Sequence, residues 1–162
     1  MIKLELVDNI QYVIMDNGEN KQNPEFASEM LDLLNRIVEN PDVQSVVLTS
    51  SDEKNWSQGI DLFWIKSAFE KKDFGAIKDF LYKMSDVFKT LLMYPIPVIA
   101  EITGHAFGNG ALLACACDFR FMRGDRGFFC FPEVDVQIPF LPSMIAFAKK
   151  AVGFQKFQDS TG

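Results

Sequence analysis

Apolar positions along the chain follow two periods, and the shorter one predicts β-strands. Runs of apolar residues, or apolar residues at every second position, are typical of strands. They occur at residues 2–7, 10–15, 43–49, 98–102 and 119–122. The first two segments flank Asp8-Asn9, a pair typical of a hairpin turn. Consecutive apolar residues at 46–48 indicate a strand that is buried on both faces, as in a parallel sheet.

The longer period is helical. Asn23-Pro24 offers a capping residue and a proline for the first helical position, and apolar residues recur at helical spacing up to Asn40-Pro41. A second amphipathic helix is predicted over about residues 73–93. Shorter helices are expected from near Gly110 and over about 142–152. Because strands alternate with helices, the fold class is predicted to be α/β (mixed).

Composition and charge fit a single domain covering residues 1–162. Hydrophobic residues make up 48% of the chain, which excludes a disordered protein. A formal net charge of −6 argues against a nucleic-acid partner, which requires a basic face. The three cysteines lack paired spacing and there is a single histidine, so we expect reduced thiols and no metal site.

The sequence also carries expectations about location. No apolar segment of the signal-peptide type follows Met1, and no apolar run approaches the roughly 18 residues of a membrane span. The last residues, 159–162, do not match a peroxisomal signal. We therefore expect a cytoplasmic protein with no membrane partner.

Three segments look suited to chemistry: residues 56–62, 102–110 and 131–135. The first two are expected directly after buried strands, and ligands of parallel sheets bind beyond the carboxyl ends of strands. Glycines in both segments would let a backbone approach a ligand closely. Glycines after strands are also common in simple turns, and the second segment matches neither the dinucleotide-binding nor the P-loop pattern.

In order and spacing, these segments resemble the motifs of the crotonase (enoyl-CoA hydratase/isomerase) superfamily. Residues 56–62 resemble the family's F-S-x-G-x-D-L, and 95–100 resemble its P-x-P-V-I-A strand. Residues 104–120 resemble its G-x-A-x-G-x-G…A-C-D-x-R, and 132–134 resemble its P-E-V. Residues 16–23 resemble the loop before the family's first helix.

The resemblance implies a crotonase-like spiral of ββα units that binds an acyl-CoA thioester, with no cofactor besides the coenzyme A of the substrate. It implies that the backbone N–H groups of Ile60 and Asn109 hold the thioester oxygen; Asn109 stands where the family usually has glycine. The expected substrate contacts are Lys21, Gln58, Gly59, Asp61, Gly108 and Leu112. Lys21 and Lys54 are the candidate phosphate contacts, because of their charge rather than because of the resemblance.

The resemblance also predicts the reaction. Family hydratases use two glutamates, and the first of these positions is Leu112 here, which cannot activate water. The second is retained as Glu133, and one carboxylate suffices to move a double bond from the 3- to the 2-position of an enoyl-CoA. Glu133 is therefore the expected catalytic residue. The alternatives are a catalytically silent binding or assembly module and a hydratase-like enzyme.

Other polar residues have simpler interpretations. Asp61 is expected to cap a short helix, His105 to be a structural residue of a turn, and Cys115 and Cys117 to be buried small side chains.

The resemblance ends where the family's C-terminal helices would continue, so we expect a fold truncated at the C-terminus. The apolar surface that those helices would cover predicts a homo-oligomer, with residues 141–152 packed on another chain.

Overall fold

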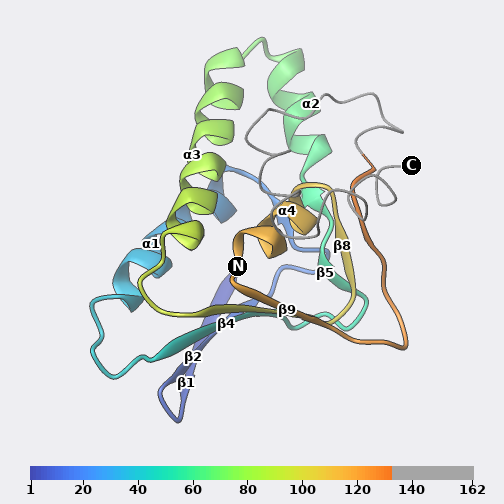
Figure 1. Cartoon of the computed structure of the whole chain (residues 1–162). Helices are drawn as coiled ribbons and strands as arrows, with labels where there is room; N and C mark the ends of the chain where they lie inside the picture. The colour runs from blue at the N-terminus through green and yellow to red at the C-terminus, as the bar shows by residue number, and fades with distance from the viewer. Residues whose placement is uncertain (133–162) are drawn as a thin grey trace.

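A computed structural model of the chain describes residues 1–132 (Figure 1). The strands are β1 (Ile2–Val7), β2 (Ile10–Met15), β3 (Lys21–Gln22), β4 (Ser45–Ser50), β5 (Asn55–Ser57), β6 (Gly59–Ile60), β7 (Val98–Ile102), β8 (His105–Phe107), β9 (Phe119–Met122) and β10 (Phe129–Cys130). The helices are α1 (Pro24–Ile37), α2 (Leu62–Glu70), α3 (Phe74–Leu92) and α4 (Asn109–Ala116). The helix predicted over 142–152 lies outside the described residues.

The large sheet contains the strands that the apolar pattern predicts. Its order is β1-β2-β4-β7-β9, with an antiparallel β1–β2 hairpin and parallel neighbours elsewhere. Asp8 and Asn9 both have positive φ, as the tight hairpin turn requires. Strand β4 begins at Ser45, two residues later than predicted, because Val43 is buried in the turn after α1 rather than in the ladder.

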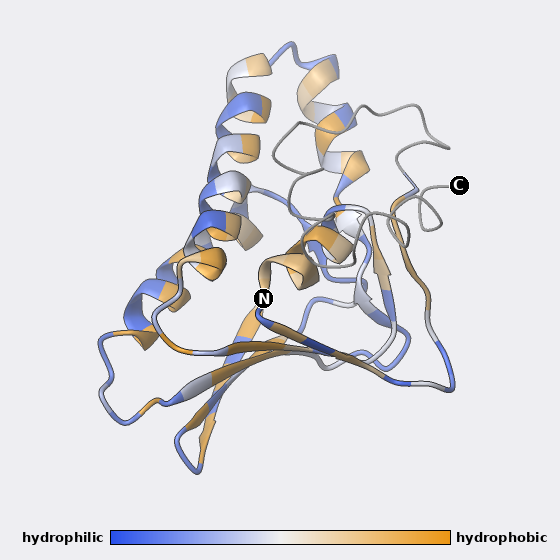
Figure 2. Ribbon diagram, in the orientation of Figure 1, coloured by the Kyte–Doolittle hydropathy of each residue, from blue (hydrophilic) through white to orange (hydrophobic). Residues whose placement is uncertain are grey.

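The core lies between the large sheet and the helices, which stand on one side of it (Figure 1). Helix α1 buries Phe26, Met30 and Leu34, and the side chain of Asn23 caps it by accepting the Phe26 N–H at 2.9 Å. Helix α3 buries one stripe toward the same core and leaves its other side in solvent. All of α4 is buried, in agreement with its largely apolar colouring in Figure 2.

A second, three-stranded sheet of order β10-β8-β5 was not apparent from the apolar pattern. All of its strands are parallel: Ala106 of β8 pairs with Phe129 of β10 on one side and with Ser57 of β5 on the other. Segment 102–110 begins at the end of the buried strand β7, as predicted, whereas residues 51–55 separate the end of β4 from segment 56–62. The short strand β8 of the second sheet falls within segment 102–110 and β5 overlaps the start of segment 56–62, which the sequence did not predict.

From β4 onward, the strands alternate between the large and the small sheet, except for β6, which pairs with β3 in a separate two-stranded sheet. Strands β4, β7 and β9 add to the large sheet in sequence order, and β5, β8 and β10 add to the small sheet in the same order. Helices follow the first two of these pairs, so the chain advances as a spiral of ββα units. The predicted mixed α/β fold class, built as a spiral of ββα units, is confirmed.

Candidate functional site

The three segments with candidate chemistry meet at one edge of the small sheet. Strands β5, β8 and β10 run parallel, so their carboxyl ends lie side by side. Residues 58–62 follow β5, Gly108 follows β8, and Phe131-Pro132 follows β10. The Gly108 N–H donates to Cys130 O at 3.0 Å, which joins the last two segments directly.

Two glycines bring the first two loops into backbone contact. A Cβ atom on Gly59 would lie 2.7 Å from Phe107 O and 3.1 Å from Asn109 N, and its φ of +79° is one that glycine tolerates best. A Cβ atom on Gly110 would collide with Ser57 O. These contacts explain physically why glycine occupies both positions.

The N–H groups of Ile60 and Asn109 lie on the facing parts of these loops. Asn109 opens α4, and the first N–H groups of a helix have no internal acceptor and carry the positive end of its dipole. Ile60 pairs with Gln22 in the parallel β3–β6 ladder, where the neighbouring Asp61 N–H donates to Gln22 O at 2.8 Å. Because successive residues of a strand point opposite ways, the Ile60 N–H is directed away from β3.

Beneath the two loops lies a layer of buried polar side chains. The Asn109 side chain turns inward, and its Nδ2 donates to Gln22 Oε1 at 2.6 Å. Asn20 Nδ2 donates to Ser50 Oγ at 2.8 Å, and Ser57 Oγ donates to Asn20 O at 2.8 Å. These hydrogen bonds satisfy groups that would otherwise be costly to bury.

Sequence reasoning missed the roles of Asn20, Gln22 and Ser57. The sequence predicts a polar loop over residues 16–23, and Ser57 falls within the predicted site segment 56–62 without a role of its own. The available signal was a cluster of amide side chains at Asn20, Gln22 and Asn23. Of these three, only Asn23 has a predicted role, as the capping residue of the helix that begins at Pro24.

The other predicted site residues occupy the surroundings of the loops. Asp61 caps α2 by accepting the N–H groups of Phe63 and Trp64, as expected. Gln58 Nε2 donates to Asn55 Oδ1 at 2.5 Å. Leu112 is 1% exposed and belongs to the apolar core, in accordance with its lack of a polar role.

Lys21, the predicted phosphate contact, lies on β3 beside the first loop. Its Nζ pairs with Glu19 at 2.6 Å and lies 5.4 Å from the centre of the Phe63 ring. The ammonium group is therefore already partnered, and binding a phosphate there would require competition with Glu19.

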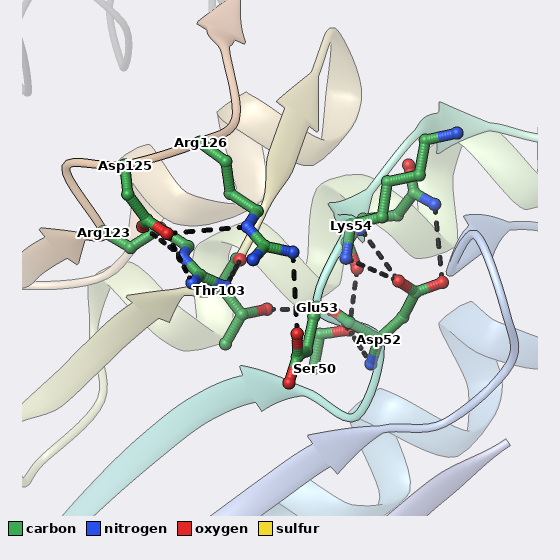
Figure 3. A network of polar contacts seen from close by, with 9 residues as sticks. Ser50, Asp52, Glu53, Lys54, Thr103, Arg123, Asp125 and Arg126 are labelled. Atoms are coloured by element: carbon green, nitrogen blue, oxygen red, sulfur yellow. Dashed lines mark hydrogen bonds and ion pairs between the residues drawn. The ribbon is translucent and has the colours of Figure 1, made fainter.

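A polar network fastens the turn before β10 to the loop after β4 (Figure 3). Arg126 pairs with Glu53 at 3.5 Å, and Thr103 Oγ1 donates to Asp52 O at 3.1 Å. The Lys54 N–H, donating at 2.7 Å, is the main cause that holds the pKa of Asp52 below its usual range. The network thus supports the segment that leads to Pro132.

Three side chains near the site have structural roles, as expected. His105 begins β8, and its Nδ1 accepts the Phe128 N–H at 3.2 Å. Cys115 and Cys117 are buried in and just after α4, and desolvation raises their thiol pKa values to about 11 and about 12. Glu133, the predicted catalytic carboxylate, lies outside the described residues.

This fold and site define an α/β protein in which glycine-bearing loops meet at the carboxyl ends of parallel strands. The sequence profile described as "Enoyl-CoA hydratase/isomerase" matches residues 5–160. The chain belongs to the enoyl-CoA hydratase/isomerase family, and the resemblance noted from its motifs is confirmed.

The relatives include both isomerases and hydratases. The chain is 34% identical over 123 residues to the peroxisomal enoyl-CoA delta isomerase 1 of Arabidopsis thaliana, covering 75% of this chain and 49% of the relative. It is 28% identical over 121 residues to the crotonyl-CoA hydratase of Syntrophomonas wolfei, covering 74% and 44%. It therefore spans about half the length of the curated relatives that it matches.

The fold is also that of solved family structures. The enoyl-CoA hydratase of Bacillus halodurans superposes with a TM-score of 0.89 over 99% of this chain and 64% of that one, at 18% identity. Within residues 1–132, none of the helices has the length and apolar character needed to cross a membrane.

Proposed function

We propose that the protein is an acyl-CoA isomerase that moves a double bond from the 3- to the 2-position of an enoyl-CoA. The observation that carries this proposal is the convergence of three parallel strand ends. Two of them lead into the loops of Ile60 and Asn109, and the third, β10, is followed by Phe131 and Pro132, the residue before Glu133. This brings two backbone donors and the approach to the one expected carboxylate to a single edge.

In the proposed mechanism, the Ile60 and Asn109 N–H groups donate hydrogen bonds to the thioester oxygen. The Glu133 carboxylate takes a proton from C2, and the electron pair of that C–H bond moves into a dienolate whose charge rests on the oxygen. The same carboxyl group then returns the proton to C4, which leaves the double bond between C2 and C3. One oxyanion donor is typically worth about 10²–10³ in rate.

Leu112 favours isomerisation over hydration. It stands in α4 where, by the family resemblance, a hydratase would carry its water-activating glutamate, and it is packed in the core. An apolar side chain there offers water no base, and excluding water protects the dienolate from side reactions. The similarity to a delta isomerase is consistent with this choice, although a hydratase is among the relatives.

The remaining proposals concern the surroundings of the enzyme. The substrate supplies the coenzyme A, with Lys21, Gln58, Gly59, Asp61, Gly108 and Leu112 as the proposed contacts. A cytoplasmic location and a homo-oligomeric assembly stay predictions from the sequence.

The test is an assay of 3-enoyl-CoA isomerisation beside 2-enoyl-CoA hydration, with the variant Glu133→Gln. This variant keeps the size and polarity of the side chain but removes the base, so turnover should fall by about 10²–10⁴ while thioester binding persists. Glu101→Gln, which changes an exposed carboxylate on β7, is the matched control and should keep wild-type turnover.

Each other outcome has a defined meaning. Hydration at a rate comparable to isomerisation would contradict the proposed reaction. An isomerase whose Glu133→Gln variant is fully active would have another base. A wild-type protein that binds CoA thioesters without converting them would be a binding module.

A further inference from the structure

One residue, Gln22, contacts both segments that carry the proposed donors to the thioester oxygen. Gln22 lies opposite Ile60 in the β3–β6 ladder, and its carbonyl accepts the Asp61 N–H at 2.8 Å. Its side-chain Oε1 accepts Asn109 Nδ2 at 2.6 Å, and its Nε2 donates to Asn109 O at 3.4 Å. The backbone of Gln22 thus fixes one loop, and its amide group fixes the other.

The hydrogen bonds of Gln22 are buried, so losing one of them is costly. Its side chain is fully buried and Asn109 is 6% exposed, so water does not replace a lost hydrogen bond readily. Nε2 also lies 3.4 Å from Ser57 Oγ, in the strand that leads into the first loop. Gln22 therefore sits at the junction of three segments of the site.

Oxyanion stabilisation depends on the distance between the two donors. The donors must both lie about 2.7–3.1 Å from one oxygen position, so a shift of one loop by about 1 Å is enough to lose a large part of the effect. Ile60 and Asn109 come from different ββα units, so their separation depends on contacts between the two segments. Besides the glycine contacts, Gln22 supplies such a link: its backbone pairs with the β6 segment, and its side-chain amide bonds to Asn109.

We propose that Gln22 is a positioning residue of the oxyanion site, which holds the Ile60 and Asn109 N–H groups at the separation that the thioester oxygen requires. This inference rests on the proposed isomerase function. Gln22 does not touch the substrate, and its effect on the rate passes through Asn109 and Ile60.

The test compares Gln22→Met with Gln11→Met. Methionine keeps the length of glutamine but forms none of its amide hydrogen bonds. Gln11 is the matched control because it is also a buried glutamine, 7% exposed, whose Nε2 donates to Glu5 O at 3.0 Å in the β1–β2 hairpin, a contact not shared with the loops. Both variants should unfold at lower urea concentration than wild type.

Only Gln22→Met should change catalysis. Its kcat should fall by about 10- to 100-fold, with KM changed by less than about threefold, because the lost interaction acts mainly in the transition state. The carbonyl stretching frequency of a bound ¹³C-labelled 2-enoyl-CoA should move back toward its value in water. Gln11→Met should keep the wild-type kcat and carbonyl frequency.

The double variant Gln22→Met/Asn109→Ala separates positioning from simple core packing. It removes both hydrogen-bonding side chains, so no buried amide loses its partner and stability should recover toward wild type. For a positioning residue, kcat and the carbonyl frequency remain impaired. Recovery of both together with stability would overturn the inference, as would a wild-type carbonyl frequency in Gln22→Met.

Failure of the proposed function gives a different result. If wild-type protein does not bind the thioester, or binds it without lowering the carbonyl frequency, the oxyanion site itself is refuted and the role of Gln22 with it. If wild type lowers the frequency and Gln22→Met lowers it equally, only the positioning role is refuted.

Discussion

Burial determines the reactivity of two cysteine side chains in this protein. Cys115 and Cys117 lie among apolar side chains of the core, and burial raises both thiol pKa values, to about 11 and about 12. The thiolate is the nucleophilic form, so neither side chain is available for covalent chemistry near neutral pH. Their role is that of small apolar residues, in agreement with the interpretation from sequence.

Alkylation tests this assignment. We expect Cys115 and Cys117 to resist iodoacetamide at about pH 8 in the folded protein and to react fully in denaturant, because only a small thiolate fraction exists below a raised pKa. Peptide mass spectrometry after timed labelling measures each site separately. Rapid modification of either residue under native conditions would contradict the burial of α4.

Asp52 illustrates a charged residue that stabilises a loop. Its side chain accepts the N–H groups of Lys54 and Asn55 at 2.7 and 3.1 Å, and the Lys54 bond is the largest cause that lowers its pKa. A carboxyl group with a lower pKa in the folded state stabilises the fold above its unfolded pKa of about 3.9. That contribution disappears as the pH falls through the folded-state pKa.

The corresponding variant is Asp52→Asn. It should be less stable than wild type near pH 7 and should lose less stability on acidification below about pH 4, since the ionised acceptor is gone. Urea unfolding at a series of pH values measures both effects. Asp79→Asn, at an exposed position of α3, is the control, and equal acid sensitivity of Asp52→Asn and wild type would refute the account.

At the scale of elements, close backbone contacts hold the β5–β6 loop against the start of α4. Gly59 lies in β6 and Gly110 in the first turn of α4, and each leaves room for backbone atoms of the other segment. The two segments can approach this closely only because neither glycine carries a Cβ atom. Short strands of two or three residues contribute few ladder bonds, so these contacts matter for their alignment.

Gly110→Ala tests the contact. Its added Cβ would meet Ser57 O, so the loops must separate, and we expect a loss of about 1–3 kcal/mol in the free energy of unfolding. Isomerase activity should fall by more than the unfolded fraction accounts for, because the two proposed donors move apart. Gly124→Ala is the control, since a Cβ at Gly124 meets nothing within 4 Å and should change stability by less than about 0.5 kcal/mol.

The molecule as a whole leaves large apolar side chains in solvent. Phe63 is 76% exposed and Phe69 is 62% exposed on α2, and Phe74 at the start of α3 is 55% exposed. Phe63 lies at the start of α2 beside the first loop, and Phe69 and Phe74 flank the α2–α3 connection, where their ring centroids are 5.5 Å apart. These exposed rings give the molecule apolar surface on this side of α2. Such surfaces commonly serve in association.

We therefore expect a homo-oligomer in solution, as the sequence also predicted. Light scattering over a wide range of protein concentrations should give a mass that is a multiple of the 18.4 kDa chain. A stable monomer at every concentration would contradict the predicted homo-oligomer.

Sequence by itself determined the elements whose apolar pattern extends over at least four residues and is bounded by turn, capping or proline residues nearby in the chain. The five strands of the large sheet, α1 and α3 follow from runs of apolar residues, and Asn23 and Asp61 were identified as caps. Motif order and spacing were enough to recognise the family. Each of these signals is written within a short stretch of chain.

Only the tertiary structure decided how the site is put together. Strands β5, β8 and β10 are two or three residues long, too short for a period, and they exist because distant strands supply their hydrogen bonds. The bond between Gln22 and Asn109 joins residues 87 positions apart, and either amide alone would suit a solvated loop. The chain encodes such a contact only through the fold that buries both partners.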